Sequence, residues 1–348
     1  MSFSVGIIGL PNVGKSTLFK ALTQQEVDIS NYPFCTINPN VGIVKVPDER
    51  LQKIAEIIKP PKITPTIIEF ADIAGLVKGA HKGEGLGNQF LAHIREVNAI
   101  LHIIRGFTDK NIKHVEDSIN PNRDIEIVNT ELIMKDLETI DKHIEKVRKE
   151  AKSDKKSIQE LQTLEKIDKE LNRGILVFNI NLSKQEKETI EHLNLLTTKP
   201  VIHLLNIRED TDYLDILKIL PDNTLPIDLK IEMEYSELSS EELKELNLKS
   251  RLDVLIKTCY KILNLITFYT IKGGEEVRAW TVKEDAKAPE AGGIVHTDFK
   301  EKFIKAEVIN YLNLLENGSW VNARSKGQIR IEGKEYIVKD GDIIEFKI

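Results

Sequence analysis

The residues with the clearest chemical meaning form the segment GLPNVGKST at positions 9 to 17. The segment has the spacing G-x-x-x-x-G-K-[ST], follows a short apolar run and precedes a helix-like stretch. Its glycines let the backbone turn tightly with the N–H groups pointing inward, and the start of a helix adds a positive dipole. Lys15 would place a charge on the β- and γ-phosphate oxygens, and the Ser16 hydroxyl would bind Mg²⁺. The segment therefore predicts a nucleoside-triphosphate site, and the spacing disfavours a purely structural turn.

A second set of residues is expected to act on Mg²⁺ and the γ-phosphate. The apolar run after Thr66 ends in the pattern D-x-x-G, formed by Asp72 and Gly75. A carboxylate at the carboxyl end of a strand can hold the water shell of Mg²⁺, and Gly75 can turn its N–H toward a γ-phosphate. Thr36 lies in the loop between the two motifs, where a first switch would bind Mg²⁺ through its hydroxyl; a plain turn around Pro33 is the alternative. These positions predict a switch-type NTPase with Ser16, Thr36 and Asp72 at the metal.

The residue after Gly75 is Leu76, where many small GTPases carry a Gln that orients the attacking water. An aliphatic side chain cannot do this. Either intrinsic hydrolysis is slow, or another polar group enters the site. The candidates for that group are His81, Arg95, Arg105 and His114.

Base recognition is expected at Asn206-Ile207-Arg208-Glu209. GTP-specific proteins carry N-K-x-D at the end of the corresponding strand, and its Asp accepts two hydrogen bonds from guanine. Here Glu209 is one methylene longer than Asp and Ile207 replaces the Lys, so the guanine clamp is expected to be misplaced. Asn206 can still bind N7 or the 6-amino group of adenine. The sequence therefore predicts loss of guanine selectivity.

These residues need a scaffold, and the apolar pattern predicts an α/β fold with a parallel sheet and crossover helices. Runs of strand length at 5–8, 67–70, 100–104 and 201–205 are separated by helical or loop-like stretches. The sheet pattern is interrupted at 126–198, so we assign residues 1–125 and 199–264 to a P-loop NTPase domain. Residues 265–348, with short strands and Gly/Asp turns, are assigned to a small β-rich C-terminal domain.

The interrupting segment, 126–198, is predicted to form a helical coiled-coil arm. Its apolar residues have heptad spacing, a polar break follows near 151–157, and a second apolar series continues at helical spacing. Two antiparallel helices sharing one seam explain this pattern, and helices packed on the sheet are the alternative. The two series are Ile133, Leu137, Ile140, Ile144 and Val147, and then Ile158, Leu161, Leu164, Ile167 and Leu171.

Composition limits the classes of partner. The chain has 348 residues, a net charge of -6 and only two cysteines, far apart. A protein that coats nucleic acid by charge alone carries a basic excess, so DNA binding is not expected and any RNA contact must be local. No apolar run approaches the ~20 residues of a membrane helix, and the N-terminus lacks the features of a signal peptide. A cytoplasmic protein without membrane association is expected.

Taken together, these residues resemble the Obg-like ATPases of the YchF group along essentially the whole chain. The resemblance rests on GLPNVGKST at 9–17, NYPFCTI at 31–37, DIAGLVKGAHKGEGLGNQFL at 72–91, the N-x-x-E at 206–209, and VRAWT and HTDF at 277–281 and 296–299. It implies a G domain with a coiled-coil insertion and a C-terminal TGS domain of β-grasp fold. It also implies Mg²⁺-dependent hydrolysis of ATP in preference to GTP and association with the ribosome or its large subunit.

Carried over by residue, the resemblance implies that ATP is held by the loop, with Mg²⁺ at Ser16 and Thr36. It raises His114 to the best candidate for a hydrolysis role beside Lys15. A GTP-hydrolysing switch and a nucleotide-gated binding module with little hydrolysis remain alternatives. The residues expected to bind the nucleotide are Asn12, Val13, Gly14, Lys15, Ser16, Thr17, Gly75, Asn206, Ile207 and Glu209.

Overall fold

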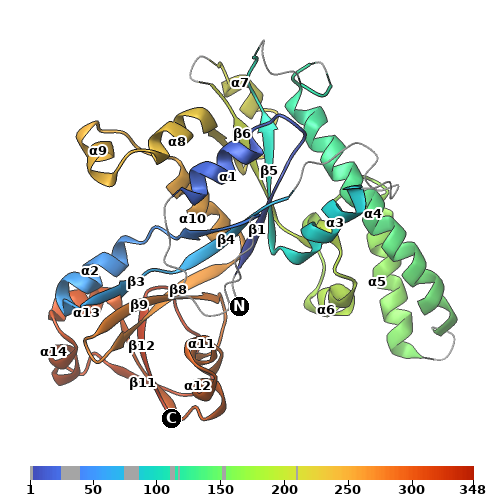
Figure 1. The fold of residues 1–348 in the computed structure, drawn as a ribbon. Coiled ribbons are helices and arrows are strands. Elements are labelled where there is room, and N and C mark those ends of the chain that lie inside the picture. Colours follow the sequence, from blue (N-terminus) through green and yellow to red (C-terminus); the bar gives the residue numbers. More distant parts are fainter. Residues whose placement is uncertain are drawn as a thin grey trace.

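The computed structural model describes residues 3–24, 40–73, 86–109, 114–116, 118–150, 154–208 and 211–348. Within these ranges the chain forms two six-stranded sheets and a helical arm (Figure 1). The predicted α/β class with an inserted arm and a C-terminal β-grasp domain is confirmed. No helix in the described ranges combines the length and the apolar character that a membrane crossing requires.

The first sheet has the strand order β2-β4-β1-β5-β6-β7 and is parallel except for β2, an antiparallel edge strand. All seven residues of β5 are buried, as expected for a central strand with helices on both faces. Helices α1, α8 and α10 cover one face, and α3 and α4 cover the other (Figure 1). The strands are β1 (Ser4–Ile8), β2 (Val41–Lys45), β4 (Ile67–Asp72), β5 (Ala99–Arg105), β6 (Val201–Asn206) and β7 (Thr224–Ile227). The helices are α1 (Lys15–Thr23), α3 (Leu86–Glu96), α4 (Pro121–Glu150), α8 (Leu229–Ser236) and α10 (Leu252–Ile262).

The arm consists of the long helix α4, which α5 (Lys155–Leu171) follows and packs against, and short helical segments that lead back to β6. Its apolar side chains form a cluster separate from the core of the sheet. The coiled-coil interpretation is therefore correct, and the distal arm does not pack on the sheet. One residue differs from the prediction: Ile158 is 44% exposed, because the seam begins a turn later, at Leu161. The short segments are η3 (Val177–Asn179), α6 (Lys184–Ile190), η4 (Glu191–Leu193) and η5 (Leu196–Thr198).

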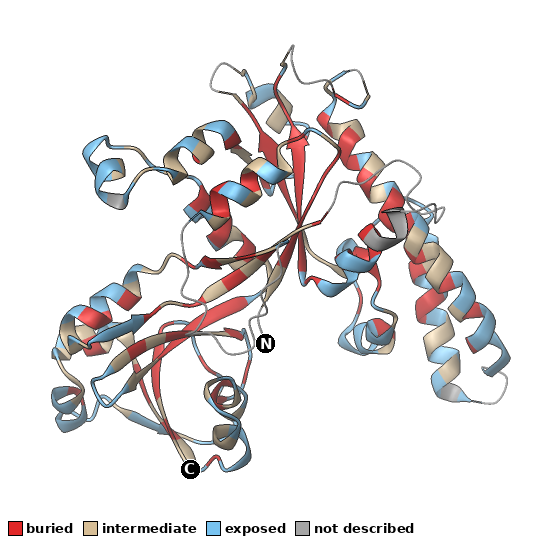
Figure 2. Cartoon of the chain, viewed as in Figure 1, coloured by how far each residue is buried: buried red, intermediate tan, exposed pale blue. Residues whose placement is uncertain are grey.

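The C-terminal sheet has the order β11-β10-β12-β8-β9-β3. The first and last strands of residues 265–348, β8 and β12, are parallel neighbours, which is the arrangement of a β-grasp fold. In Figure 2 the residues coloured as buried lie mainly on its inner strands. The strands are β8 (Leu265–Lys272), β9 (Glu276–Lys283), β10 (Lys305–Asn310), β11 (Arg330–Glu332) and β12 (Asp342–Lys347). The remaining helices are α7 (Leu214–Leu217), α9 (Ser240–Glu245), α11 (Ala288–Val295), α12 (Thr297–Glu301), α13 (Tyr311–Asn317) and α14 (Trp320–Ser325).

Residues 49–64 pack with the C-terminal sheet, although we placed them in the NTPase domain. Strand β3 (Lys62–Thr64) pairs with β9, and α2 (Glu49–Ile58) buries Leu51 and Ile54 among apolar residues of the C-terminal sheet. The segment lies between two strands of the first sheet, β2 and β4, so the chain leaves that sheet and returns to it. Local periodicity could not show this, because the partner strand lies more than two hundred residues away.

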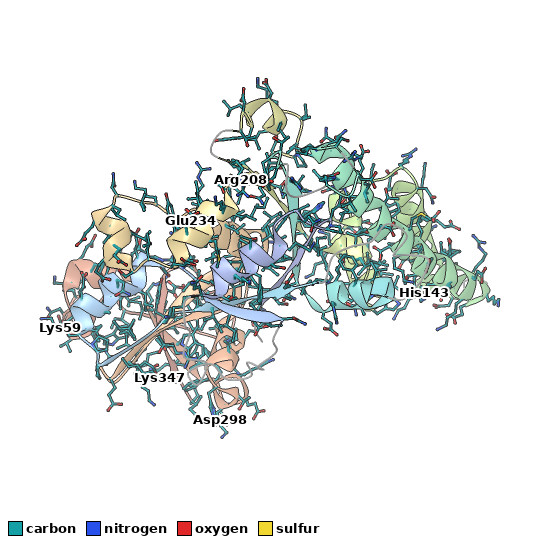
Figure 3. The ribbon with its side chains drawn as sticks, turned by 45° about the horizontal axis from the view of Figure 1, so that its top comes forward. Lys59, His143, Arg208, Glu234, Asp298 and Lys347 are labelled. Atoms are coloured by element: carbon teal, nitrogen blue, oxygen red, sulfur yellow. The ribbon has the colours of Figure 1, made fainter. Side chains whose placement is uncertain are left out.

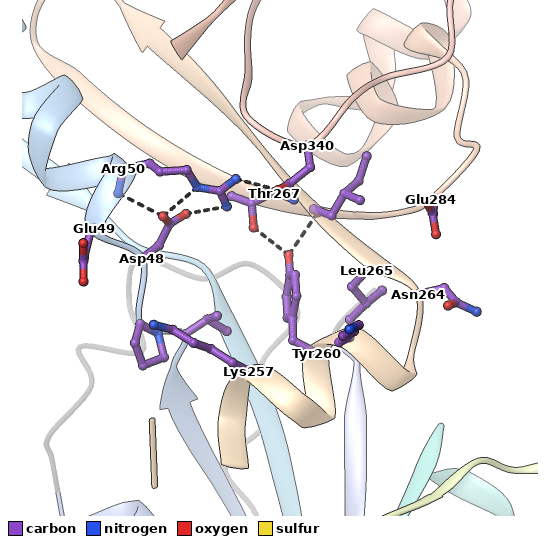
Figure 4. A pocket seen from close by; sticks show the side chains of 14 residues that line it. Asp48, Glu49, Arg50, Lys257, Tyr260, Asn264, Leu265, Thr267, Glu284 and Asp340 are labelled. Atoms are coloured by element: carbon purple, nitrogen blue, oxygen red, sulfur yellow. Dashed lines mark hydrogen bonds and ion pairs between the residues drawn. The ribbon is translucent and has the colours of Figure 1, made fainter. Parts of the chain in front are cut away.

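An ion-pair network, in which Asp48 is buried, Arg50 partly exposed and Asp340 exposed, fixes this junction (Figure 4). Arg50 Nε donates to Asp48 Oδ1 at 2.8 Å, and Arg50 Nη1 donates to Asp340 Oδ2 at 2.6 Å. Asp48 also accepts hydrogen bonds from the Tyr269 hydroxyl of β8 and from the Arg50 N–H at the start of α2. Burial acts to lower the pKa of Arg50, but the hydrogen bonds to the two carboxylates outweigh it, and the net pKa is raised. The guanidinium therefore joins the start of α2 to the loop before β12.

Two histidines occupy the centre of the first sheet. His102 of β5 is paired in register with His203 of β6, and their ring centroids are 5.7 Å apart. Neither ring nitrogen of His102 has a hydrogen-bond partner among the described residues. Burial, with smaller contributions from His203 and Lys15, lowers the pKa of His102 well below its usual value, and burial also lowers the pKa of His203. Both rings are therefore neutral in the folded protein.

We expect these rings to make the protein less stable in mild acid. Because their folded pKa values lie below about 6.5, the unfolded chain binds more protons as pH falls through that value. The free energy of unfolding should then fall by up to about 1.4 kcal/mol per pH unit for each ring. Urea unfolding at several pH values between neutral and mildly acidic measures this slope. The double substitution His102→Leu with His203→Leu should reduce this pH dependence, whereas His296→Gln, at an exposed site, should leave it unchanged. Equal slopes in the unmodified protein and in both variants would contradict the assignment.

Candidate functional site

The loop between β1 and α1 has the backbone conformation that the glycine spacing predicted. Gly9, Asn12 and Gly14 have positive φ values of 152°, 62° and 111°. A Cβ on Gly14 would lie 2.6 Å from Nδ2 of Asn206, and one on Gly9 would lie 2.5 Å from the carbonyl oxygen of Ile103. Both glycines are therefore required by the close approach of neighbouring strands as well as by the turn. This shape places the loop directly over the carboxyl ends of β5 and β6.

Lys15 and Asp72 are brought close together at this edge. Lys15 Nζ donates to the carbonyl oxygens of Gly9 at 3.0 Å and Leu10 at 2.8 Å. Burial lowers the pKa of Lys15, and the Asp72 charge opposes that shift; burial raises the pKa of Asp72, and Lys15 opposes that shift. Asp72 is the last residue of β4 and is paired in register with Ile7 of β1. Because β1 and β4 are paired, the phosphate loop and the end of β4 lie at the same edge of the first sheet.

The donor set at this edge suits a hard divalent cation. Ser16 lies exposed in the first turn of α1, and Asp72 provides a half-buried carboxylate at the adjacent strand end. Mg²⁺ binds through one or two protein oxygens and completes its octahedron with water and phosphate oxygens. A hydroxyl and a carboxylate beside a phosphate-binding loop fit that requirement, and no nitrogen or sulfur ligand is needed.

Asn206 has a role that the sequence analysis did not assign. It is 3% exposed, its Nδ2 donates to the carbonyl oxygen of Val13 at 2.9 Å, and its Oδ1 accepts the N–H of Leu229 at 3.3 Å. The side chain therefore ties the phosphate loop to the start of α8. Ile207, expected to line the base, packs its side chain into a buried apolar cluster with Leu205 and Leu220. Both side chains are therefore held inside the fold at the end of β6, where the base was predicted to bind.

Three side chains that sequence reasoning did not connect meet at the same edge. The Phe107 ring lies between two guanidinium groups, with Arg105 Cζ 4.6 Å and Arg208 Cζ 4.3 Å from its centroid. Arg208 also pairs with Asp228 at 3.1 Å, and Asp228 caps the start of α8. Arg208 is labelled in Figure 3. Their positions just beyond the ends of β5, β6 and β7 are the signal that could have suggested this grouping.

The structure places His114 in a buried hydrogen bond to Asp124. Its Nε2 lies 2.9 Å from Asp124 Oδ2, and its Nδ1 accepts the N–H of Glu116 at 3.2 Å. Asp124 also pairs with Arg123 at 3.1 Å. Both ring nitrogens of His114 are thus engaged with the start of α4. Of the other candidates for orienting water, Arg95 bonds to Thr139 of the arm, and Arg105 is buried against Phe107.

Several predicted site residues lie outside the described part of the chain. They are Thr36, Gly75 and Glu209 of the expected binding set, together with Leu76 and His81. Their roles stay predictions. The described residues of the site are Asn12, Val13, Gly14, Lys15, Ser16, Thr17, Asp72, His114, Asn206 and Ile207.

Comparisons with known proteins agree with this geometry. Residues 4–207 match the family profile described as 50S ribosome-binding GTPase, and residues 265–348 match the profile of the YchF GTPase C-terminal domain, whose function its description leaves unknown. The Ribosome-binding ATPase YchF of Bacillus subtilis is 46% identical over 364 residues, covering 100% of this chain and 99% of that protein. The protein of the same name from Pasteurella multocida is 45% identical over 361 residues, with 100% and 99% covered. The solved structure of the Schizosaccharomyces pombe YchF GTPase is 39% identical and superposes with a TM-score of 0.87, covering 99% of this chain and 98% of that one.

Proposed function

Because this chain belongs to the YchF family, we propose that it is a ribosome-associated P-loop ATPase that requires Mg²⁺, prefers ATP to GTP and acts in the cytoplasm. The observation that supports this most directly is that the phosphate loop with Lys15 follows β1, and Asp72 ends the paired strand β4 at the same edge of the sheet. The base edge lacks the Lys and Asp of a guanine clamp, which supports the choice of nucleotide.

We assign the residues as follows. The N–H groups of Asn12 to Thr17 surround the phosphates, and Lys15 moves from the loop carbonyls to the β- and γ-phosphate oxygens when ATP binds. Ser16, Thr36 and Asp72 would hold Mg²⁺, and that ion would supply positive charge to offset the charge of the phosphates. Gly75 turns its N–H toward the γ-phosphate. Asn206 and Ile207 set the position of the base edge, and Glu209 completes the assigned binding set.

The choice of base is tested by side-by-side turnover with ATP and GTP at equal Mg²⁺. We expect a kcat/KM for ATP at least about tenfold above that for GTP, because the two-bond guanine clamp is absent. As a matched test, Ile207→Lys with Glu209→Asp restores the N-K-x-D pattern and should raise GTP turnover. A GTP preference in the unmodified protein would contradict the proposal.

For His114 we propose that it assists hydrolysis after its pairing with Asp124 opens. His114→Ala should then lower kcat for ATP by about 10²-fold, the lower range for a positioned proton-transfer group. ATP affinity should change little, because His114 is not part of the phosphate loop. His143→Ala, at a histidine of the arm, is the control. Full turnover in a folded His114→Ala protein would leave His114 as a structural partner of Asp124 only.

Ribosome association is tested by co-sedimentation with ribosomes in the ATP-bound and ADP-bound states. We expect co-sedimentation to differ between these states, because a switch couples its nucleotide to its partner. The charge of residues 265–348 is nearly balanced, with 13 basic and 14 acidic residues, so any RNA contact there must be local. Lys300→Glu and Lys305→Glu probe that contact more cleanly than deletion, since deletion would expose the face of α2 that the C-terminal sheet covers. No sedimentation in either state would overturn this part of the proposal.

A further inference from the structure

The arm carries three side chains with metal-binding atoms that the nucleotide site does not use. They are His143 of α4, Glu160 of α5 and His192 of η4, and one nitrogen or oxygen from each lies within 4.8 Å of the others. The three come from segments that are separated in sequence and meet only in the folded arm. Figure 3 shows His143 on the arm, away from Arg208 at the base edge.

The three atoms surround a point where one ion could be bound. His143 Nε2 lies 2.7 Å from Glu160 Oε1, and His192 Nε2 lies 3.9 Å from that same oxygen. Two ligands bound tetrahedrally at 2.0–2.1 Å from Zn²⁺ lie about 3.3 Å apart, midway between these separations. The two imidazole rings are 5.1 Å apart and tilted by 59°. Small rotations of partly exposed side chains are enough to reach the metal-bound geometry.

We propose that His143, Glu160 and His192 form a binding site for a borderline divalent transition metal, with Zn²⁺ as its representative. Two imidazoles and one carboxylate are a ligand set typical of Zn²⁺ with a fourth, water-filled position. Hard cations are disfavoured, because Mg²⁺ and Ca²⁺ prefer oxygen ligands throughout. The site lies outside the nucleotide pocket and does not depend on the proposed ATPase activity.

Neighbouring positive charges limit the metal affinity of the site, but the site remains open to solvent. His192 has 54% of its side chain exposed, so an ion can enter from solvent and keep a water ligand. The adjacent groove also contains Arg95, Lys135 and Lys142, whose charges oppose a cation. Lys135 is offset by Glu138, to which it donates at 2.8 Å. We therefore expect a moderate affinity that depends on all three ligands.

An ion at this point would join the two long helices to the segment that returns toward the sheet. His192 lies between α6 and η5, and the apolar residues around it belong to the arm cluster. Because the bound metal stabilises only the folded arm, it should suppress local opening of residues 176–195. Metal binding at this site should therefore make the arm more rigid.

The test uses the full-length, nucleotide-free protein in excess Mg²⁺, with CoCl₂ as a spectroscopic probe and ZnCl₂ as competitor. We expect one equivalent of Co²⁺ to give d–d absorption of a four- or five-coordinate ion that ZnCl₂ removes. His143→Gln, Glu160→Gln and His192→Gln should each weaken binding by at least about tenfold. His296→Gln, an exposed histidine of the C-terminal domain beside Asp298, is the matched control and should bind normally.

Hydrogen exchange supplies a second readout that does not depend on spectroscopy. ZnCl₂ should slow exchange at residues 176–195 in the unmodified protein and in His296→Gln, but not in His192→Gln. The last variant changes an exposed side chain and should fold normally, which circular dichroism checks. Undiminished Co²⁺ binding in His192→Gln, or no stoichiometric binding in the unmodified protein, would overturn the proposal and leave a hydrogen-bonded cluster.

Discussion

Lys15→Ala should lower ATP turnover by about 10³-fold, because one positioned charge on the transferred phosphate contributes that much in comparable sites. The partly buried amine contacts two loop carbonyls and lies close enough to Asp72 for each charge to shift the other's pKa. No other described lysine or arginine has this position in the loop. Phosphate release in a coupled assay measures the change.

Lys20→Ala is the matched control for that substitution. Lys20 is exposed on the same helix, α1, and its removal should leave turnover within about twofold, as expected of a surface change. Turnover that survives Lys15→Ala would mean that the activity belongs to a contaminant. It would also favour the alternative of a nucleotide-gated binding module for the chain itself.

Arg50→Ala should lower the free energy of unfolding by about 3–4 kcal/mol, in the range found when one partner of a buried ion pair is removed. The substitution leaves Asp48, whose side chain is 8% exposed, with a buried charge and without its guanidinium partner. It also removes the ion pair to Asp340 and the packing of the guanidinium over Tyr269. Urea unfolding near pH 7 measures the loss.

The control for Arg50→Ala is Lys53→Ala on the same helix, α2. Lys53 is exposed, so its removal should change the free energy of unfolding by less than about 0.5 kcal/mol. Equal stability of the Arg50 and Lys53 variants would show that the network adds nothing to the junction. A separate early unfolding step in Arg50→Ala would show instead that the network couples the C-terminal sheet to α2.

This junction gives the two sheets a shared boundary. Residues 49–64 leave the first sheet after β2, pack against the C-terminal sheet and return at β4, whose last residue is Asp72. A displacement of the C-terminal sheet would therefore act on the end of β2 and on the start of β4, the strand that carries a predicted magnesium-binding carboxylate. The Arg50 network is the contact through which that coupling can be measured.

The phosphate loop could be predicted from the sequence alone because its function depends on consecutive residues. Gly9, Gly14 and Lys15 act through local backbone geometry, and the structure gives the glycines the positive φ values that the motif requires. The arm was also predictable, since heptad spacing fixes which face of a helix is buried. The replacement of the guanine-binding Lys and Asp is likewise a property of adjacent residues.

Contacts between distant segments were decided only by the tertiary structure. Asn206 ties Val13 to Leu229, β3 joins a sheet formed more than two hundred residues later, and the ring of Phe107 lies between two arginines. Such contacts depend on strand order and on the path of connecting segments, which local periodicity does not encode. Ile158 illustrates the limit at short range. Helical spacing placed it in the apolar series of the second helix but did not show at which residue the seam begins. The sequence therefore determined the chemistry of the loop, and the fold determined which residues hold that loop in place.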